Sequence, residues 1–179
     1  MTLPIAQSLL RKGAWRGAAE RVTLDYEARF LRRKKLVTEG GEAFVVDLEH
    51  TTSLDAGDAL QMADGRLVEI VAAEEPCLIV TGESLARLAW HIGNRHTPCQ
   101  VEAGRLVIRD DKVIAHMLAH LGAKVVPTML PFTPEGGAYG HGRTHAHEHG
   151  KSAHDHEHGH SHSHDHSHDH SHDHDHAHG

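Results

Sequence analysis

The sequence is short of cysteine, of aromatic residues and of long apolar runs. Its two cysteines, Cys77 and Cys99, form neither a disulfide framework nor a paired zinc-binding motif. No stretch is long and apolar enough to cross a bilayer, and the N-terminus lacks the charged and apolar regions of a signal peptide. The sequence therefore predicts a cytoplasmic protein without a membrane segment.

Common catalytic motifs are also missing. The sequence contains no His-Glu-x-x-His, no Gly-x-Ser-x-Gly and no phosphate-binding glycine loop. A catalytic metal ordinarily keeps several fixed protein ligands, whereas outside the C-terminal tail only His96 is well placed to be one. We therefore predict a protein that is not an enzyme.

The net charge of −7 at pH 7 is concentrated near the C-terminus. Residues 1–140 hold 16 basic and 18 acidic side chains, whereas residues 141–179 hold two basic and seven acidic side chains. Such a balanced body, poor in aromatic residues, predicts no nucleic-acid partner. A solvated strand edge is the favoured interpretation of the one basic run, ahead of a protein-docking surface and then a nucleic-acid patch. This run consists of Arg29, Arg32, Arg33, Lys34 and Lys35.

Histidine is the residue that the sequence has in abundance. Residues 141–179 carry 17 of the 22 histidines, mostly alternating with Asp, Ser, Gly or Glu. Almost no apolar side chain is present there to form a core, so we predict a disordered tail over residues 140–179. A histidine-rich tract of this kind is typical of divalent-metal binding, and imidazole suits nickel, zinc and copper.

Residues 1–73 have the pattern of an all-β domain. Side chains alternate between apolar and polar over residues 21–26. Asp64-Gly65 separates two further alternating segments, which predicts a hairpin with a type I′ turn. Additional short strands are expected near residues 28–31, 36–38 and 43–48. We predict a small sandwich or a partly open barrel.

Residues 74–139 change to a mixed pattern. Strands are expected over 77–81, 99–102, 105–108 and 124–130, with helices over 84–93 and 111–121. The resulting order, β-α-β-β-α-β, is that of the ferredoxin-like fold. The predicted class is therefore α+β, with an all-β N-terminal domain (1–73), a ferredoxin-like metal-binding domain (74–139) and a histidine-rich metal-binding tail (140–179).

His96 follows the first of these helices closely. Apolar residues recur at helical spacing through Leu85, Leu88, Ala89 and Ile92, which predicts one buried face. Gly93 is expected to end the helix in the left-handed conformation, and Pro98 prevents the helix from resuming. We therefore expect His96 to project from a rigid turn, available to a metal.

The second helix carries two further histidines. Its predicted core face is Val113, Ile114, Met117, Leu118 and Leu121. His116 and His120 stand four residues apart on the polar flank, where a solvated face is favoured over a weak metal site. Cys77 is expected to be buried, and Cys99 is a lesser candidate for a soft metal ligand.

Several motifs together resemble the urease accessory protein E family, the nickel metallochaperones of urease maturation. The resemblance rests on the stretch from Gly93 to Pro98, on the 130–139 segment Leu-Pro-Phe-x-Pro-Glu-x-Gly-Ala-Tyr, on Gly57-Asp58-x-Leu60 and on the histidine tail. It implies a peptide-binding type of N-terminal domain and a metal-binding C-terminal domain. Some members carry His-x-His where this chain has Asp110-Asp111-Lys112, so the resemblance does not carry over a second site of that kind, and His116 and His120 one turn later are the candidates for a partial substitute.

The resemblance also implies a homodimer in which both copies of His96 share one Ni²⁺, with Zn²⁺ and Cu²⁺ as competitors. Tail histidines would complete or feed that site, beginning with His141, His145, His147 and His149. The implied partners are an accessory GTPase of the UreG type and the complex of urease apoprotein with its accessory proteins. The alternative is a general store or buffer for divalent metals that acts through the tail alone.

Overall fold

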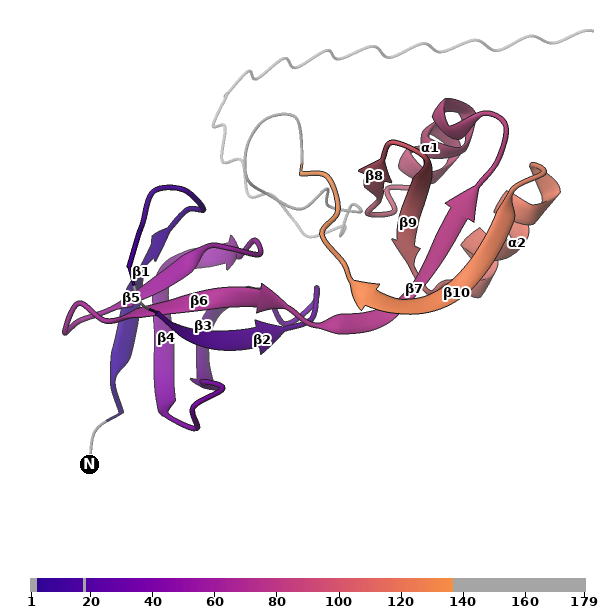
Figure 1. Cartoon of the computed structure of the whole chain (residues 1–179). Coiled ribbons are helices and arrows are strands. Elements are labelled where there is room, and N and C mark those ends of the chain that lie inside the picture. Colours follow the sequence, from indigo (N-terminus) through magenta and orange to yellow (C-terminus); the bar gives the residue numbers. More distant parts are fainter. Residues whose placement is uncertain (1–2, 18, 137–179) are drawn as a thin grey trace, which may run out of the picture. The chain divides into compact units, whose positions relative to one another are not determined.

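The computed structural model describes residues 3–17 and 19–136, which form two β-sheets and two helices (Figure 1). Strands alone make up the regular structure of the N-terminal part, whereas both helices belong to the C-terminal part. The predicted α+β class is therefore confirmed. In the described part of the chain, neither helix is long and apolar enough to span a membrane.

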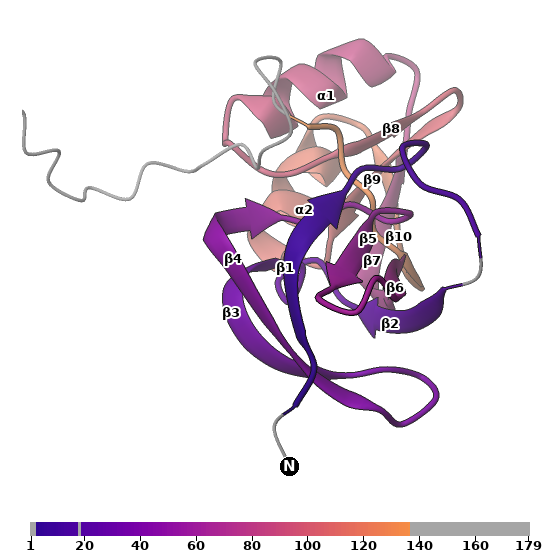
Figure 2. The ribbon, with the colours of Figure 1, turned by 90° about the vertical axis from the view of Figure 1, so that its left-hand side faces the viewer.

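The first sheet contains six strands in the order β2-β6-β5-β1-β4-β3 (Figures 1 and 2). Its strands are β1 (Ile5–Leu10), β2 (Glu20–Leu24), β3 (Phe30–Val37), β4 (Ala43–Ser53), β5 (Ala59–Met62) and β6 (Leu67–Ala72). The β1–β4 and β2–β6 pairs are parallel, and the other pairs are antiparallel. A single core, with Phe44, Val46 and Leu60 among its members, lies on one face of this sheet.

The two edges of the first sheet are joined at one point. Glu39, just after β3, donates its backbone N–H to the carbonyl of Arg21 in β2 at 2.8 Å. The hydroxyl of Thr23 donates to the Glu39 carboxylate at 2.6 Å. One sheet that curls until its edges touch agrees with a partly open barrel and not with a two-sheet sandwich.

Strand β3 corrects the expectation of two short strands at 28–31 and 36–38. Residues 26–29 form a turn, and a single strand contains most of the basic run. Leu31 and Leu36 are both buried although they are five residues apart, which breaks the alternation of a regular strand. The register with β4 shifts between Leu31 and Arg33, and this irregularity restores the phase.

The basic run is exposed along a sheet edge, except for its first member. Residues 32–35 are exposed on β3, which has a strand on only one side. This placement fits the solvated-edge interpretation. Arg29 is instead buried, and its guanidinium donates to the backbone carbonyl of Phe132.

The hairpin between β5 and β6 forms as expected, but its turn is not type I′. A type I′ turn requires positive φ at both Asp64 and Gly65, and of these only Gly65 has it, at 88°. Gly65 N–H donates to Met62 C=O at 3.0 Å, and Met62 N–H donates to Arg66 C=O at 2.9 Å. This is the pattern of a three-residue loop with a glycine bulge. The Asp64 carboxylate accepts from the backbone N–H of Arg66, which lowers the pKa of that carboxyl.

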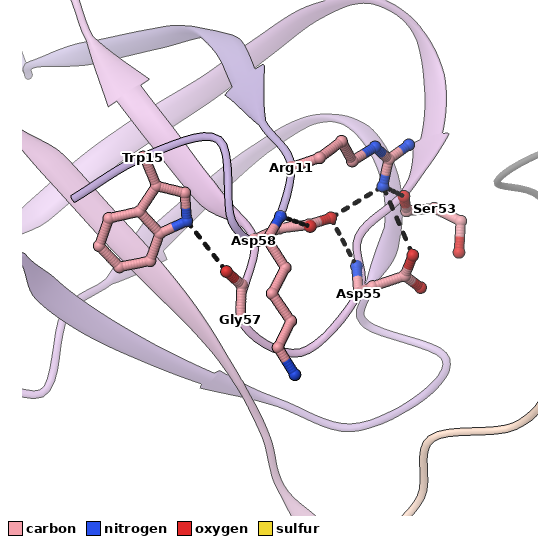
Figure 3. Close-up of polar contacts among 7 residues, drawn as sticks. Arg11, Trp15, Ser53, Asp55, Gly57 and Asp58 are labelled. Atoms are coloured by element: carbon pink, nitrogen blue, oxygen red, sulfur yellow. Dashed lines mark hydrogen bonds and ion pairs between the residues drawn. The ribbon is translucent and has the colours of Figure 1, made fainter.

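A buried carboxylate fixes the loop that precedes β5 (Figure 3). Asp58 is 1% exposed and accepts hydrogen bonds from Arg11 Nη1 at 2.8 Å and from the backbone N–H groups of Lys12 and Asp55 at 2.9 Å. The indole N–H of Trp15 donates to the Gly57 carbonyl at 3.0 Å. The Gly57-Asp58 motif therefore has a structural role, since it ties this loop to the end of β1.

The second sheet has four antiparallel strands in the order β10-β7-β9-β8. Its strands are β7 (Glu74–Thr81), β8 (Gln100–Glu102), β9 (Arg105–Arg109) and β10 (Lys124–Pro131), and its helices are α1 (Leu85–Gly93) and α2 (Lys112–His120). The order along the chain is β-α-β-β-α-β, as the sequence predicts. Leu88 and Ile92 of α1 and Ile114 and Leu118 of α2 pack into one core with strand residues such as Leu106.

The predicted core face of α2 is wrong at one residue, Val113. Val113 is 76% exposed, whereas Ile114 and Leu118 are buried. Consecutive residues of an α-helix are turned by about 100°, so Val113 points well away from the stripe that runs through Ile114 and Leu118. Val113 lies one residue outside that stripe, in the first turn. It therefore faces solvent, like His116 three residues later.

Candidate metal site at the end of helix α1

His96 sits at the end of a tight turn that continues from α1. The backbone N–H groups of Asn94, Arg95 and His96 donate to the carbonyls of Trp90, Ile92 and Gly93 at 2.9, 3.1 and 2.9 Å. Thr97 N–H also points to the Ile92 carbonyl, at 3.4 Å. These short-range hydrogen bonds extend the helix by one irregular turn, and His96 lies at the end of that turn.

The left-handed residue of this turn is His96 and not Gly93, which corrects the expectation from the sequence. His96 has φ of 54°, and it is the only residue other than glycine with positive φ in the described part of the chain. Gly93 is still helical. Positive φ is uncommon outside glycine and costs about 1 kcal/mol or more, so it is tolerated only where the surroundings enforce it.

The surroundings of His96 are rigid on the side of the helix. Ile92 is fully buried, and its carbonyl accepts from two N–H groups of the turn. Leu88, one turn earlier, belongs to the same core. The His96 residue itself is exposed. The structure therefore supports the prediction that this histidine projects from a fixed base, although the backbone conformation that achieves this is different.

The end of the described chain lies beside the segment that follows His96. Glu135 N–H donates to the Cys99 carbonyl at 2.9 Å. Thr133 donates to the Gln100 side-chain carbonyl from its backbone N–H at 2.8 Å and from its hydroxyl at 3.2 Å. These hydrogen bonds fasten residues 133–135 along β8 and its approach, only a few residues from His96 in the chain. The sequence carries no periodic signal for this contact.

Neither cysteine is prepared to be a metal ligand. Burial, followed by the charge of Glu135, raises the pKa of the Cys99 thiol to about 11. Burial, followed by the charge of Glu75, raises that of Cys77 to about 11 as well. Metals bind the thiolate, which is scarce at neutral pH when the pKa is this high. This favours the interpretation of Cys99 as a small packed side chain.

The described residues bring no complete metal site together. Among residues 3–17 and 19–136, no group of three or more His, Cys, Asp or Glu side chains converges as a ligand set. His116 and His120 are in contact, with 3.0 Å between their Nε2 atoms. The predicted tail ligands lie outside the described residues: His141, His145, His147 and His149. The role of His96 as a metal ligand therefore stays a prediction at this point.

Comparisons with known proteins agree on one family. Residues 5–73 match the family model described as the N-terminal domain of UreE urease accessory protein, and residues 75–178 match its C-terminal domain. The urease accessory protein UreE of Ruegeria pomeroyi is 60% identical over 145 residues, which cover 81% of this chain and 97% of that protein. The UreE of Cereibacter sphaeroides is 62% identical over 143 residues, covering 79% and 78%. That of Paracoccus denitrificans is 56% identical over 142 residues, covering 79% and 90%.

Proposed function

The chain belongs to the urease accessory protein UreE family, and from this premise we propose that it is a metallochaperone that delivers Ni²⁺ to urease apoprotein. The family consists of accessory proteins for urease and not of enzymes, so the expectation of a non-enzyme is confirmed. The observation that supports the nickel role is His96. It is an exposed residue at a left-handed turn, and this turn continues from a helix that packs into the core.

A single His96 is too little for tight binding, so the proposal includes a homodimer. A two-fold axis through the site would supply the same imidazole from each subunit, and cyclic dimers are the commonest way to double a ligand. Two fixed ligands also leave positions open. An open shell suits a carrier, because a closed four-ligand site holds its metal structurally.

The tail supplies further ligands in this proposal. Residue 141 follows Glu135 by six positions, and six residues span at most about 20 Å. Since Glu135 is fastened to Cys99, this length of chain is enough to return His141 to the neighbourhood of His96. Later histidines, including His145, His147 and His149, have still longer tethers. Tethered ligands act at high effective concentration and help to capture the metal without high individual affinity.

The remaining features of the proposal follow from the family. They include a boundary near residue 73 between the two folded domains, a ferredoxin-like C-terminal domain and a cytoplasmic location. The partners are an accessory GTPase of the UreG type and the urease apoprotein complex. Ni²⁺ is bound by nitrogen ligands more tightly than most divalent ions, whereas Cu²⁺ exceeds it and Zn²⁺ competes, so geometry and supply must set the selectivity.

Nickel calorimetry on the full chain tests the role of His96. The His96→Ala variant is compared with wild type and with His50→Ala, a control that removes another exposed histidine. We expect wild type and control to bind one Ni²⁺ tightly per two chains, and His96→Ala to lose this phase while keeping the weaker binding of the tail. Urease activity in nickel-limited cells should fall in the same variant. An unchanged tight phase in His96→Ala would refute the assignment.

A general metal store is the second candidate, and it is favoured by the 17 histidines of residues 141–179. In that case the tail binds all the metal and the folded part is only a carrier. A chain ending at residue 139 separates the two functions. One Ni²⁺ bound tightly per two truncated chains would exclude the store, whereas loss of all tight nickel binding would agree with it.

A further inference from the structure

Helix α2, labelled in Figure 1, carries a pair of imidazoles and is a different element from the turn that holds His96. His116 and His120 are both exposed, one helical turn apart. Their Nε2 atoms are 3.0 Å apart, and the ring centroids are 4.4 Å apart with the ring planes at 87°. Two nitrogens therefore already face each other across one turn of the helix, and this contact needs neither a second copy of the chain nor the tail.

The separation of the two nitrogens matches the bite of a bidentate metal site. Imidazole nitrogens lie about 2.0–2.1 Å from a bound transition metal. With 3.0 Å between the Nε2 atoms, the nitrogen–metal–nitrogen angle is roughly 95°. This is the angle of neighbouring ligands in an octahedral or tetragonal shell, whereas a tetrahedral shell needs about 3.3 Å. The pair therefore already has the spacing of two neighbouring ligands of one transition-metal ion.

The helix beneath the pair is held at both ends and along its buried side. The Asp111 carboxylate caps its start by accepting from Val113 N–H at 2.8 Å and Ile114 N–H at 3.0 Å. Gly122 follows its end with φ of 84°, the left-handed conformation that ends a helix. Ile114 and Leu118 are buried in the core. Because the backbone is fixed in advance, binding a metal orders only the two imidazole rings.

The geometry points to a bidentate site, made by His116 and His120 on each protomer, for a divalent cation that prefers nitrogen ligands, Ni²⁺ or Cu²⁺. Without a metal, the contact is a hydrogen bond in which one Nε2–H donates to the other Nε2. When the metal binds, both rings carry their proton on Nδ1, so that both Nε2 lone pairs reach the metal. Water completes the shell on the exposed side. The site goes beyond the proposed function and does not depend on it, since it requires no dimer and no His96.

Chemical modification of individual histidines in the full-length protein tests this site, with NiCl₂ as the probe. Diethyl pyrocarbonate modifies imidazole nitrogens that are not bound to a metal, and peptide mass spectrometry reports each histidine separately. At a nickel concentration ten times the dissociation constant, we expect modification of His116 and His120 to slow about tenfold. His50, an exposed histidine of β4 with a side chain that is 82% exposed, should be unaffected.

The His120→Gln variant shows whether the protection comes from chelation. Because this variant lacks one of the two nitrogen ligands, nickel should no longer slow the modification of His116. In the matched His50→Gln variant, nickel should slow the modification of His116 as much as in wild type. Circular dichroism confirms that α2 is intact in both. The inference is overturned if nickel leaves His116 unprotected in wild type. It is equally overturned if His116 stays protected in His120→Gln, because shielding would then come from another part of the molecule.

Discussion

Two groups of polar side chains, one in each sheet region, have opposite roles in this protein. In the first sheet, Asp58 is buried and receives hydrogen bonds from Arg11 and from two backbone N–H groups. Beside the second sheet, His96, His116 and His120 are instead exposed on helices or at their ends, above a core that includes Leu88 and Ile92. The first arrangement stabilises the fold. The second keeps histidines at the surface, where no polar group has to be buried without a partner.

The comparison predicts that polar substitutions in the first sheet change stability and that those in the second change metal binding. Asp58→Ala should have the largest effect, because it leaves Arg11 and two N–H groups without their shared acceptor. We expect a loss of about 3 kcal/mol in the free energy of unfolding, measured by urea denaturation. Nickel binding by the protein that remains folded should not change.

Asp55→Ala is the matched control for that substitution. Asp55 lies in the same loop, and its carboxylate is 3.6 Å from Arg11 Nη1 and more than half exposed. Its backbone N–H, the group that donates to Asp58, is kept in the alanine variant. We expect a loss below about 0.5 kcal/mol. Equal losses in the two variants would mean that the buried carboxylate is not what holds the loop.

His96→Ala should produce the opposite result. Under the proposed function, the affinity for the tightest nickel should fall at least about a hundredfold, or about 2.7 kcal/mol, since a symmetric site loses two ligands at once. The free energy of unfolding without metal should change by less than about 0.5 kcal/mol, because the residue is exposed. A large loss of stability would contradict the division between the two sheets.

The conformation found at His96 also shows how much of the structure can be predicted from the sequence. The periodic apolar residues of α1, the hairpin around Gly65 and the β-α-β-β-α-β order all follow from local patterns, and the structure contains them. The left-handed conformation of His96 could not be predicted, because Gly93 supplied the usual signal for a helix end three residues too early. The irregular pairing between β3 and β4 could not be predicted for a similar reason, since only the contact between the two strands sets their register.

Other parts of the candidate site depend on contacts that no single-chain pattern encodes. The hydrogen bond between Glu135 and Cys99 joins backbone atoms alone, so the residue types at these two positions do not predict it. A shared site between two copies of His96 is likewise a property of an assembly. The roles of His141, His145, His147 and His149, which fall outside the described residues, stay predictions.

The backbone at His96 gives a smaller prediction that separates its conformation from its side chain. Glycine adopts positive φ without a steric cost, whereas alanine does not. At this position, which has φ of 54°, His96→Gly should therefore be more stable than His96→Ala by about 1 kcal/mol, measured by urea denaturation without metal. Both variants should lose the tight nickel equally. Equal stability would mean that the left-handed turn is not enforced in solution.

The last prediction concerns the two cysteines at high pH. Burial raises the pKa of the Cys77 and Cys99 thiols to about 11, above the ordinary value of 9.0. The folded state therefore holds these protons more firmly than the unfolded state. The resulting stability is fully present below pH 9 and is lost as the pH rises towards 11. Urea denaturation at pH 8, 9 and 10 should show this decline in the free energy of unfolding. The decline should be smaller in Cys99→Ala than in wild type. Since Cys99 packs against the core of the second sheet, a decline of the same size in wild type and variant would indicate that Cys99 contributes nothing to it.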